Sequence, residues 1–190
     1  MKNIANKLTI FRMVLVFPII IFLSCDFIKY RWIYSFIIFL LASYTDHLDG
    51  KLARKQNNIT DFGKIMDPLA DKLLVISIFT YFVGFGIAPT LPVVMMIARE
   101  FIVTAMRFLA TKSGGPVIPA NIFGKLKTVS QMFSITVIMV FEIYIEITGK
   151  SLGFQFGTFS SLLTWICSAF SIISGIIYIF ENINNIKIDK

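Results

Sequence analysis

Six apolar segments, each close to the length of a membrane-spanning helix, restrict the fold of this chain more than any other feature. A helix needs about 20 mostly apolar residues to cross the hydrocarbon core of a bilayer. The segments lie at roughly 8–25, 32–49, 67–86, 91–111, 125–147 and 158–181. With 56% hydrophobic residues and 20 phenylalanines in 190 residues, the chain is far more apolar than a soluble domain. The sequence therefore predicts an all-α, polytopic membrane protein with six transmembrane helices in a single domain over residues 1–190.

Glycine and proline are predicted to separate the later segments, because both interrupt regular helices. The separating residues are Gly84, Gly86, Pro89 and Pro92, then Ser113-Gly114-Gly115-Pro116 and Pro119, then Gly149, Gly153 and Gly157.

The basic residues predict the orientation of these helices. With both termini inside, twelve basic residues fall on the inner side, namely Lys2, Lys7, Lys51, Arg54, Lys55, Lys64, Lys72, Lys112, Lys125, Lys127, Lys187 and Lys190. Only Lys29, Arg31 and Lys150 fall on the outer side. The positive-inside rule therefore predicts a multi-pass protein of the cell (cytoplasmic) membrane with both termini cytoplasmic. The net charge of +7 suits a bilayer with anionic headgroups, and the scattering of basic residues between apolar segments argues against a nucleic-acid partner.

A cluster of acidic and small residues lies between the second and third segments. Within 26 residues it contains Asp46, Asp49, Gly50, Ala53, Arg54, Gly63, Asp67 and Asp71. Carboxylates are costly beside hydrocarbon, so four of them together predict a cation that they hold jointly. Hard divalent ions such as Mg²⁺ and Mn²⁺ prefer such all-oxygen ligand sets.

Helical spacing predicts two faces within this cluster. The first face, with offsets of 0, 3, 4 and 7 on the second helix, consists of Asp46, Asp49, Gly50 and Ala53. Asp67 and Asp71 share the second face, and Pro68 predicts that Asp67 lies at or near the start of the third helix. Brought together at the cytoplasmic ends of helices 2 and 3, four carboxylates would surround two metal ions, an arrangement suited to phosphoryl transfer. The small residues leave room for a ligand, and Arg54 offers a fork of donors to a nucleotide diphosphate.

This spacing resembles the signature of the CDP-alcohol phosphotransferase family, D-x2-D-G-x2-A-R-x8-G-x3-D-x3-D, at every fixed position. Four further segments resemble the members that make phosphatidylglycerophosphate: residues 6–12 (NKLTIFR), 67–72 (DPLADK), 97–101 (IAREF) and 124–128 (GKLKT). The resemblance covers most of the chain up to about residue 130, whereas the sixth segment resembles the family only in its hydrophobicity.

The resemblance implies transfer of the phosphatidyl group of CDP-diacylglycerol to the primary hydroxyl of sn-glycerol 3-phosphate, without a covalent intermediate. It assigns CDP-diacylglycerol binding to Gly50, Ala53, Arg54 and Gly63, with Asn6 and Thr9. It assigns two Mg²⁺ or Mn²⁺ ions to Asp46, Asp49, Asp67 and Asp71. Asp71 would also be the general base. Relatives of this kind often pair, so a homodimer is compatible with the resemblance.

Four basic residues are candidates for binding the acceptor's phosphate. Arg99 and Arg107 lie inside a predicted span, where a charge is costly and a functional role is the default hypothesis. Lys125 and Lys127 follow on the same predicted cytoplasmic side. The alternative is that an arginine pairs with Glu100 or a lipid headgroup and only orients its helix.

Two other functions compete with this one. The first keeps the fold and the donor but changes the acceptor to phosphatidylglycerol, giving cardiolipin, or to inositol phosphate or serine. The second is a divalent-cation transporter that uses the aspartates as its pathway. Such a transporter should carry its acidic residues near mid-membrane and in paired halves, whereas these lie at one edge beside Arg54.

Overall fold

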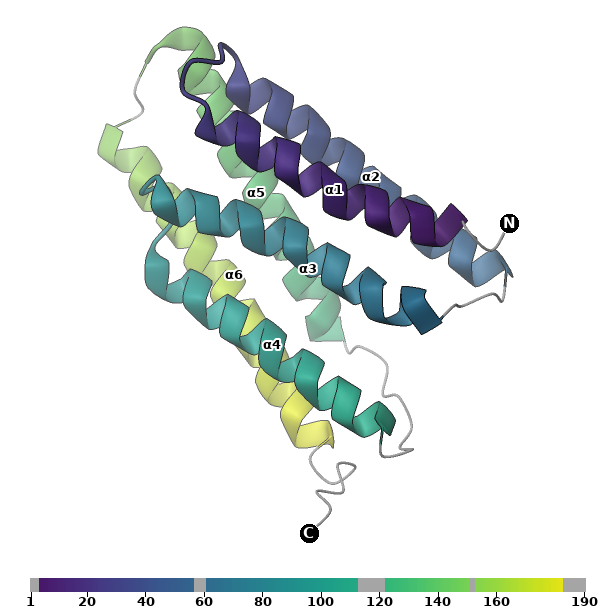
Figure 1. Ribbon diagram of the computed structural model, residues 1–190. Helices are drawn as coiled ribbons and strands as arrows, with labels where there is room; N and C mark the ends of the chain where they lie inside the picture. Colours follow the sequence, from purple (N-terminus) through teal and green to yellow (C-terminus); the bar gives the residue numbers. More distant parts are fainter. Residues whose placement is uncertain (1–3, 57–60, 113–121, 151–152, 183–190) are drawn as a thin grey trace. The chain divides into compact units, whose positions relative to one another are not determined.

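The computed structural model describes residues 4–56, 61–112, 122–150 and 153–182, and within them the chain is helical with short turns (Figure 1). The helices are α1 (Ile4–Ser24), α2 (Arg31–Gln56), α3 (Asp61–Gly84), α4 (Thr90–Lys112), α5 (Ile122–Thr148) and α6 (Gly153–Asn182). The described residues contain no strand. The predicted all-α class is thereby confirmed for the described part of the chain, and each predicted segment corresponds to one helix.

Two helix boundaries in the acidic cluster differ from the prediction. α2 continues to Gln56, seven residues beyond the predicted end at 49, so Ala53 and Arg54 lie on the helix. α3 begins at Asp61, and the prediction that Asp67 lies at or near its start is therefore wrong. Proline is tolerated in the first turn of a helix, which was the basis of the prediction. A helix can also continue through an interior proline such as Pro68, although it loses one backbone hydrogen bond there.

The predicted glycine separators also divide into two kinds. Gly86 and Gly149 adopt positive φ values of 71° and 65° in the turns after α3 and α5. The N–H of Gly149 donates to the Ile145 carbonyl over 2.9 Å, which closes the end of α5. Gly157, by contrast, lies inside α6, and its prediction as a separator is wrong, whereas Gly153 is the first residue of α6. An interior glycine costs only about 1 kcal/mol relative to alanine, too little to end a long apolar helix. The predicted separators from Ser113 to Pro119 lie outside the described residues.

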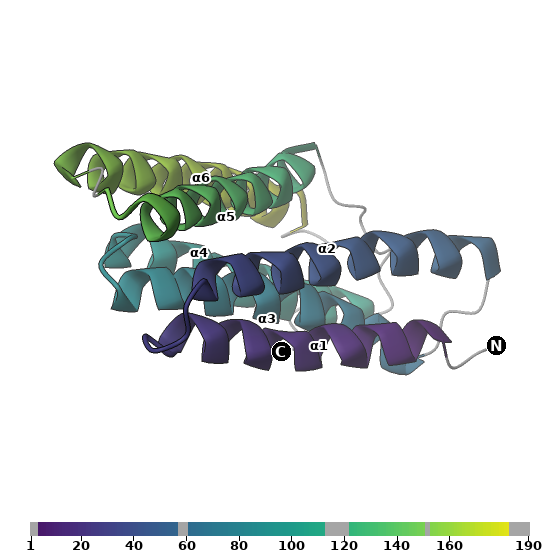
Figure 2. The ribbon, with the colours of Figure 1, turned by 90° about the horizontal axis from the view of Figure 1, so that it is seen from above.

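The helices form two compact units, each of which takes part of α3 and α5. The first unit contains α1, α2, α3 up to Tyr81 and α5 from Thr136. Within it α1 packs along α2, as Figures 1 and 2 both show. The second unit contains the end of α3 from Phe82, α4, α5 up to Ile135 and α6, with α4 packed along α6.

Polar contacts hold the turn between α1 and α2 in the first unit. The carbonyl oxygen of Leu23 accepts hydrogen bonds from the Tyr81 hydroxyl at 2.6 Å and from the Arg31 guanidinium at 3.2 Å. The ring of Trp32 meets the Tyr81 ring edge-on, with their centres 6.0 Å apart. These contacts attach α3 and the start of α2 to the end of α1.

Glu146 of α5 caps the N-terminus of α2. Its Oε2 accepts a hydrogen bond of 3.3 Å from the N–H of Trp32, in the first turn of α2. First-turn N–H groups have no acceptor within their own helix, and a carboxylate there also interacts favourably with the helix dipole. We expect Glu146→Ala to lower the free energy of unfolding by about 1 kcal/mol. Unfolding in detergent would measure this, with Glu181→Ala as a control because Glu181 is exposed; equal losses would contradict the capping role.

Within the described residues, two helical stretches are long and apolar enough to cross a membrane, judged by length and composition: Ile122–Thr148 and Phe156–Glu181. Shorter apolar stretches in the described part of the chain are Leu8–Ser24, Arg31–Thr45 and Lys72–Gly84. Large apolar side chains such as Phe17, Phe101 and Phe180 are exposed by 65%, 65% and 74%. Such exposure suits contact with lipid better than contact with water. That all six helices span a membrane stays a prediction.

Candidate active site

The residues of the acidic cluster lie on two consecutive helices of the first unit. α2 carries Asp46, Asp49, Gly50, Ala53 and Arg54, and α3 carries Gly63, Asp67 and Asp71. The structure describes the helical backbone at these positions, and their side chains lie outside the described part. Because α2 is continuous through Gln56, the offsets of 0, 3, 4 and 7 remain a single helical stripe.

The helix boundaries give the position of each aspartate along its own helix. α2 and α3 run in opposite directions (Figures 1 and 2). With a rise of 1.5 Å per residue, Asp49 lies about 10 Å before the end of α2, and Asp67 lies about 9 Å after the start of α3. Asp46 and Asp71 each lie about 15 Å from those same ends. Each helix therefore carries its two aspartates about one helical turn apart.

This placement fits divalent metal ions. The donor set contains only carboxylates, which suits hard cations such as Mg²⁺ and Mn²⁺. Each helix contributes two aspartates about one helical turn apart. Among the residues whose side chains the structure describes, no group of three or more histidine, cysteine, aspartate or glutamate residues forms a rival metal site.

α1 contributes two buried polar residues to the first unit. Thr9 is 0% exposed and Arg12 is 1% exposed, and their spacing of three places them on one face of α1. A buried guanidinium requires compensating partners, because removing its charge from water is costly. Arg12 was not among the predicted site residues, although a charged residue inside an apolar segment is itself a signal for a functional role. The side chain of Asn6, the other predicted ligand on α1, lies outside the described part.

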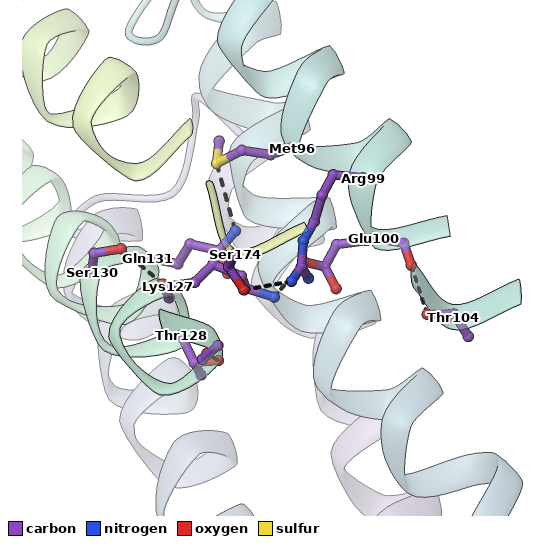
Figure 3. A network of polar contacts seen from close by, with 10 residues as sticks. Met96, Arg99, Glu100, Thr104, Lys127, Thr128, Ser130, Gln131 and Ser174 are labelled. Atoms are coloured by element: carbon purple, nitrogen blue, oxygen red, sulfur yellow. Dashed lines mark hydrogen bonds and ion pairs between the residues drawn. The ribbon is translucent and has the colours of Figure 1, made fainter. Parts of the chain in front are cut away.

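Two of the four predicted phosphate-binding residues meet in the second unit (Figure 3). Glu100 Oε1 accepts a hydrogen bond of 2.9 Å from Arg99 Nη1 and also pairs with Lys127 Nζ. Arg99 Nη2 donates to Ser174 Oγ over 2.7 Å. The cluster Arg99–Glu100–Lys127–Ser174, called the cation network below, thus joins α4, α5 and α6.

The other two predicted residues do not join this network through any contact that the structure describes. The guanidinium carbon of Arg107 lies 5.7 Å from the centre of the Tyr178 ring, within the range of a cation–π interaction. Lys125 is exposed, whereas Lys127 is 9% exposed. Residues two positions apart on a helix point in directions about 200° apart, which explains why Lys125 and Lys127 differ in exposure.

The cation network is largely buried and combines two basic side chains with one carboxylate. Glu100 is 5% exposed and balances one of the two cations, Arg99 or Lys127. The contact between Arg99 and Glu100 confirms the pairing that the sequence analysis named as an alternative. The contact of Glu100 with Lys127 was not predicted from the sequence. An arginine fork beside a lysine suits binding of a phosphate, and that role for these residues stays a prediction.

Known proteins resemble the chain over nearly all of its length. The sequence profile of the family described as CDP-alcohol phosphatidyltransferase matches residues 2–173. A Bacillus subtilis protein named CDP-diacylglycerol–glycerol-3-phosphate 3-phosphatidyltransferase is 35% identical over 98% of both chains. Proteins of the same name from Rickettsia typhi and Wigglesworthia glossinidia brevipalpis are 35% and 41% identical. The Rickettsia alignment covers 94% of this chain and 96% of the relative, and the Wigglesworthia alignment covers 76% and 81%.

Proposed function

Because this chain belongs to the CDP-alcohol phosphatidyltransferase family, we propose that it transfers the phosphatidyl group of CDP-diacylglycerol to sn-glycerol 3-phosphate. The products are phosphatidylglycerophosphate and CMP. The observation that carries this proposal is the full family signature, whose residues lie on the helices α2 and α3. The choice of acceptor is supported by three relatives that share one enzyme name and align along most of this chain.

In the proposed reaction, the primary hydroxyl of glycerol 3-phosphate attacks the lipid-bearing phosphorus of CDP-diacylglycerol. Asp71 takes the proton of that hydroxyl, and the bond between phosphorus and the bridging oxygen of CMP breaks. Arg54 donates hydrogen bonds to the diphosphate and balances negative charge on the leaving CMP. Gly50, Ala53 and Gly63 leave space for the nucleotide beside the helix backbones. Asn6 and Thr9 of α1 complete the proposed CDP-diacylglycerol site.

Members of this family generally use divalent metal ions. We propose that Asp46, Asp49, Asp67 and Asp71 hold two of them, Mg²⁺ or Mn²⁺. Such ions would neutralise charge on the diphosphate as the transferred group moves.

The remaining assignments concern the acceptor and the membrane. We propose that the acceptor's phosphate binds Arg99, Arg107, Lys125 and Lys127. The support is the chemistry of the cation network, in which one positive charge is not balanced by Glu100. We further propose that α1 to α6 all span the cytoplasmic membrane as one domain, with both termini cytoplasmic and a homodimer as the assembly. The exposed apolar side chains support membrane insertion.

An acceptor panel would test the proposed reaction. We expect purified protein with CDP-diacylglycerol and Mg²⁺ or Mn²⁺ to release CMP only when glycerol 3-phosphate is present. Phosphatidylglycerol, inositol phosphate and serine are the competing acceptors, and a chelator should abolish release because the aspartates would lose their ions. Release of CMP with another acceptor would show that the acceptor is assigned wrongly, while the transfer reaction of the family would still stand. If folded protein released no CMP with any acceptor, the transferase would be refuted and metal transport would be tested next.

A further inference from the structure

α6 contacts both arginines of α4 through residues one helical turn apart. Ser174 Oγ accepts a hydrogen bond from Arg99, and the ring of Tyr178 lies beneath the guanidinium of Arg107. Gly175 lies between them and contacts the stem of Arg99. In Figure 3 the side chains of Ser174 and Arg99 point toward each other, with Glu100 beside them. One short segment of α6 therefore contacts two predicted phosphate-binding residues.

A side chain at position 175 would collide with Arg99. A Cβ atom there would lie 2.7 Å from Arg99 Cγ and 3.1 Å from Arg99 Nε. The guanidinium is held at its far end by Ser174 and Glu100, so the side chain cannot move aside without losing those contacts. The Nε atom is buried and makes no hydrogen bond within the described part of the chain. The absence of a side chain at 175 therefore leaves the space that the stem of Arg99 occupies.

We infer that Ser174, Gly175 and Tyr178 form a positioning surface that fixes Arg99 and Arg107 for the phosphate of the acceptor. The inference rests on the proposed function, in which these arginines bind that phosphate. An arginine fork that is already oriented loses less conformational freedom on binding than a mobile one. The positioning surface touches no substrate itself, so its effect should appear in acceptor binding and leave CDP-diacylglycerol binding unchanged.

The test compares Gly175→Ala with Gly157→Ala, the same substitution in the same helix at a site with no atom within 4 Å of the added Cβ. We expect Gly175→Ala to raise the KM for glycerol 3-phosphate about tenfold, because a misplaced arginine weakens a charge-assisted hydrogen bond. The KM for CDP-diacylglycerol should stay within about twofold of the wild-type value, because the substitution does not alter the residues proposed to bind that substrate. Gly157→Ala should leave both values unchanged.

Ser174→Ala and Ser174→Thr keep the inference testable if Gly175→Ala does not fold. Ser174→Ala should raise the KM for glycerol 3-phosphate. Ser174→Thr retains the hydroxyl, so its KM should lie between those of the wild type and Ser174→Ala. A change in thermal stability with both KM values unaltered, or an equal rise in both, would mean that α6 only packs against α4 and would overturn the inference.

A binding measurement separates failure of this inference from failure of the proposed function. Glycerol 3-phosphate and inorganic phosphate should each raise the melting temperature of the wild type, and more weakly that of Gly175→Ala. If wild type binds phosphate and the variant binds it equally well, the positioning role is wrong even when the enzyme is active. If wild type binds neither probe, the arginines hold no phosphate and the inference is overturned. Binding without CMP release would instead count against the proposed reaction alone.

Discussion

Replacing Asp71 by asparagine is expected to lower kcat about a thousandfold with CDP-diacylglycerol and glycerol 3-phosphate. Asparagine has nearly the same shape as aspartate, but it cannot accept a proton and it binds divalent ions poorly. The proposed base and one metal ligand are therefore lost together. CMP release under saturating concentrations of both substrates measures the effect.

Asp26→Asn is the matched control for this experiment. Asp26 lies outside the family signature, pairs with Arg31 and is 78% exposed, so its replacement should leave kcat within about twofold of wild type. A variant at Asp71 that kept more than a tenth of the wild-type kcat would rule out its role as the base. Recovery at high metal concentration would assign Asp71 to metal binding alone. A pH–rate profile that kept its acidic limb in the variant would lead to the same conclusion.

Replacing Glu100 by glutamine is expected to have the largest effect on stability, lowering the free energy of unfolding by about 3 kcal/mol. Glu100 is buried and pairs with both Arg99 and Lys127, so the neutral side chain would leave two cations close together without a counter-ion. Denaturant unfolding of the purified protein in detergent measures the loss. Glu181→Gln in the same unit should be nearly neutral, because Glu181 is exposed.

A double variant identifies the cause of that loss. Adding Lys127→Gln to Glu100→Gln removes one of the two unbalanced cations, and we expect it to recover part of the lost stability. Lys127→Gln alone should cost less than Glu100→Gln, because Arg99 still balances the carboxylate. If the two single losses added without coupling, the contacts around Glu100 would not be the source of the instability.

Local patterns were sufficient to predict the helices and the proposed catalytic motif. Runs of apolar residues correspond to α1 to α6, and the offsets from Asp46 to Ala53 lie on one continuous helix. Such features depend on residues close in sequence, because a helix is formed by hydrogen bonds between residues four apart. The start of α3 was predicted wrongly, because proline is favoured at the first position of a helix but a helix can also begin several residues before it.

Contacts between distant segments decided the surroundings of the predicted phosphate-binding residues. Glu100 and Lys127 are 27 residues apart, and Arg99 and Ser174 are 75 apart. The local pattern gave Gly175 no special role, yet a Cβ atom at Gly175 would meet Arg99, whereas one at Gly157 would meet nothing within 4 Å. The sequence by itself determined the family signature, the apolar segments and the expected chemistry, because these depend on spacing along one helix. Only the tertiary structure decided that Lys127 is buried, that Glu100 pairs with it and that Gly175 leaves space for Arg99. These features depend on the packing of one helix against another.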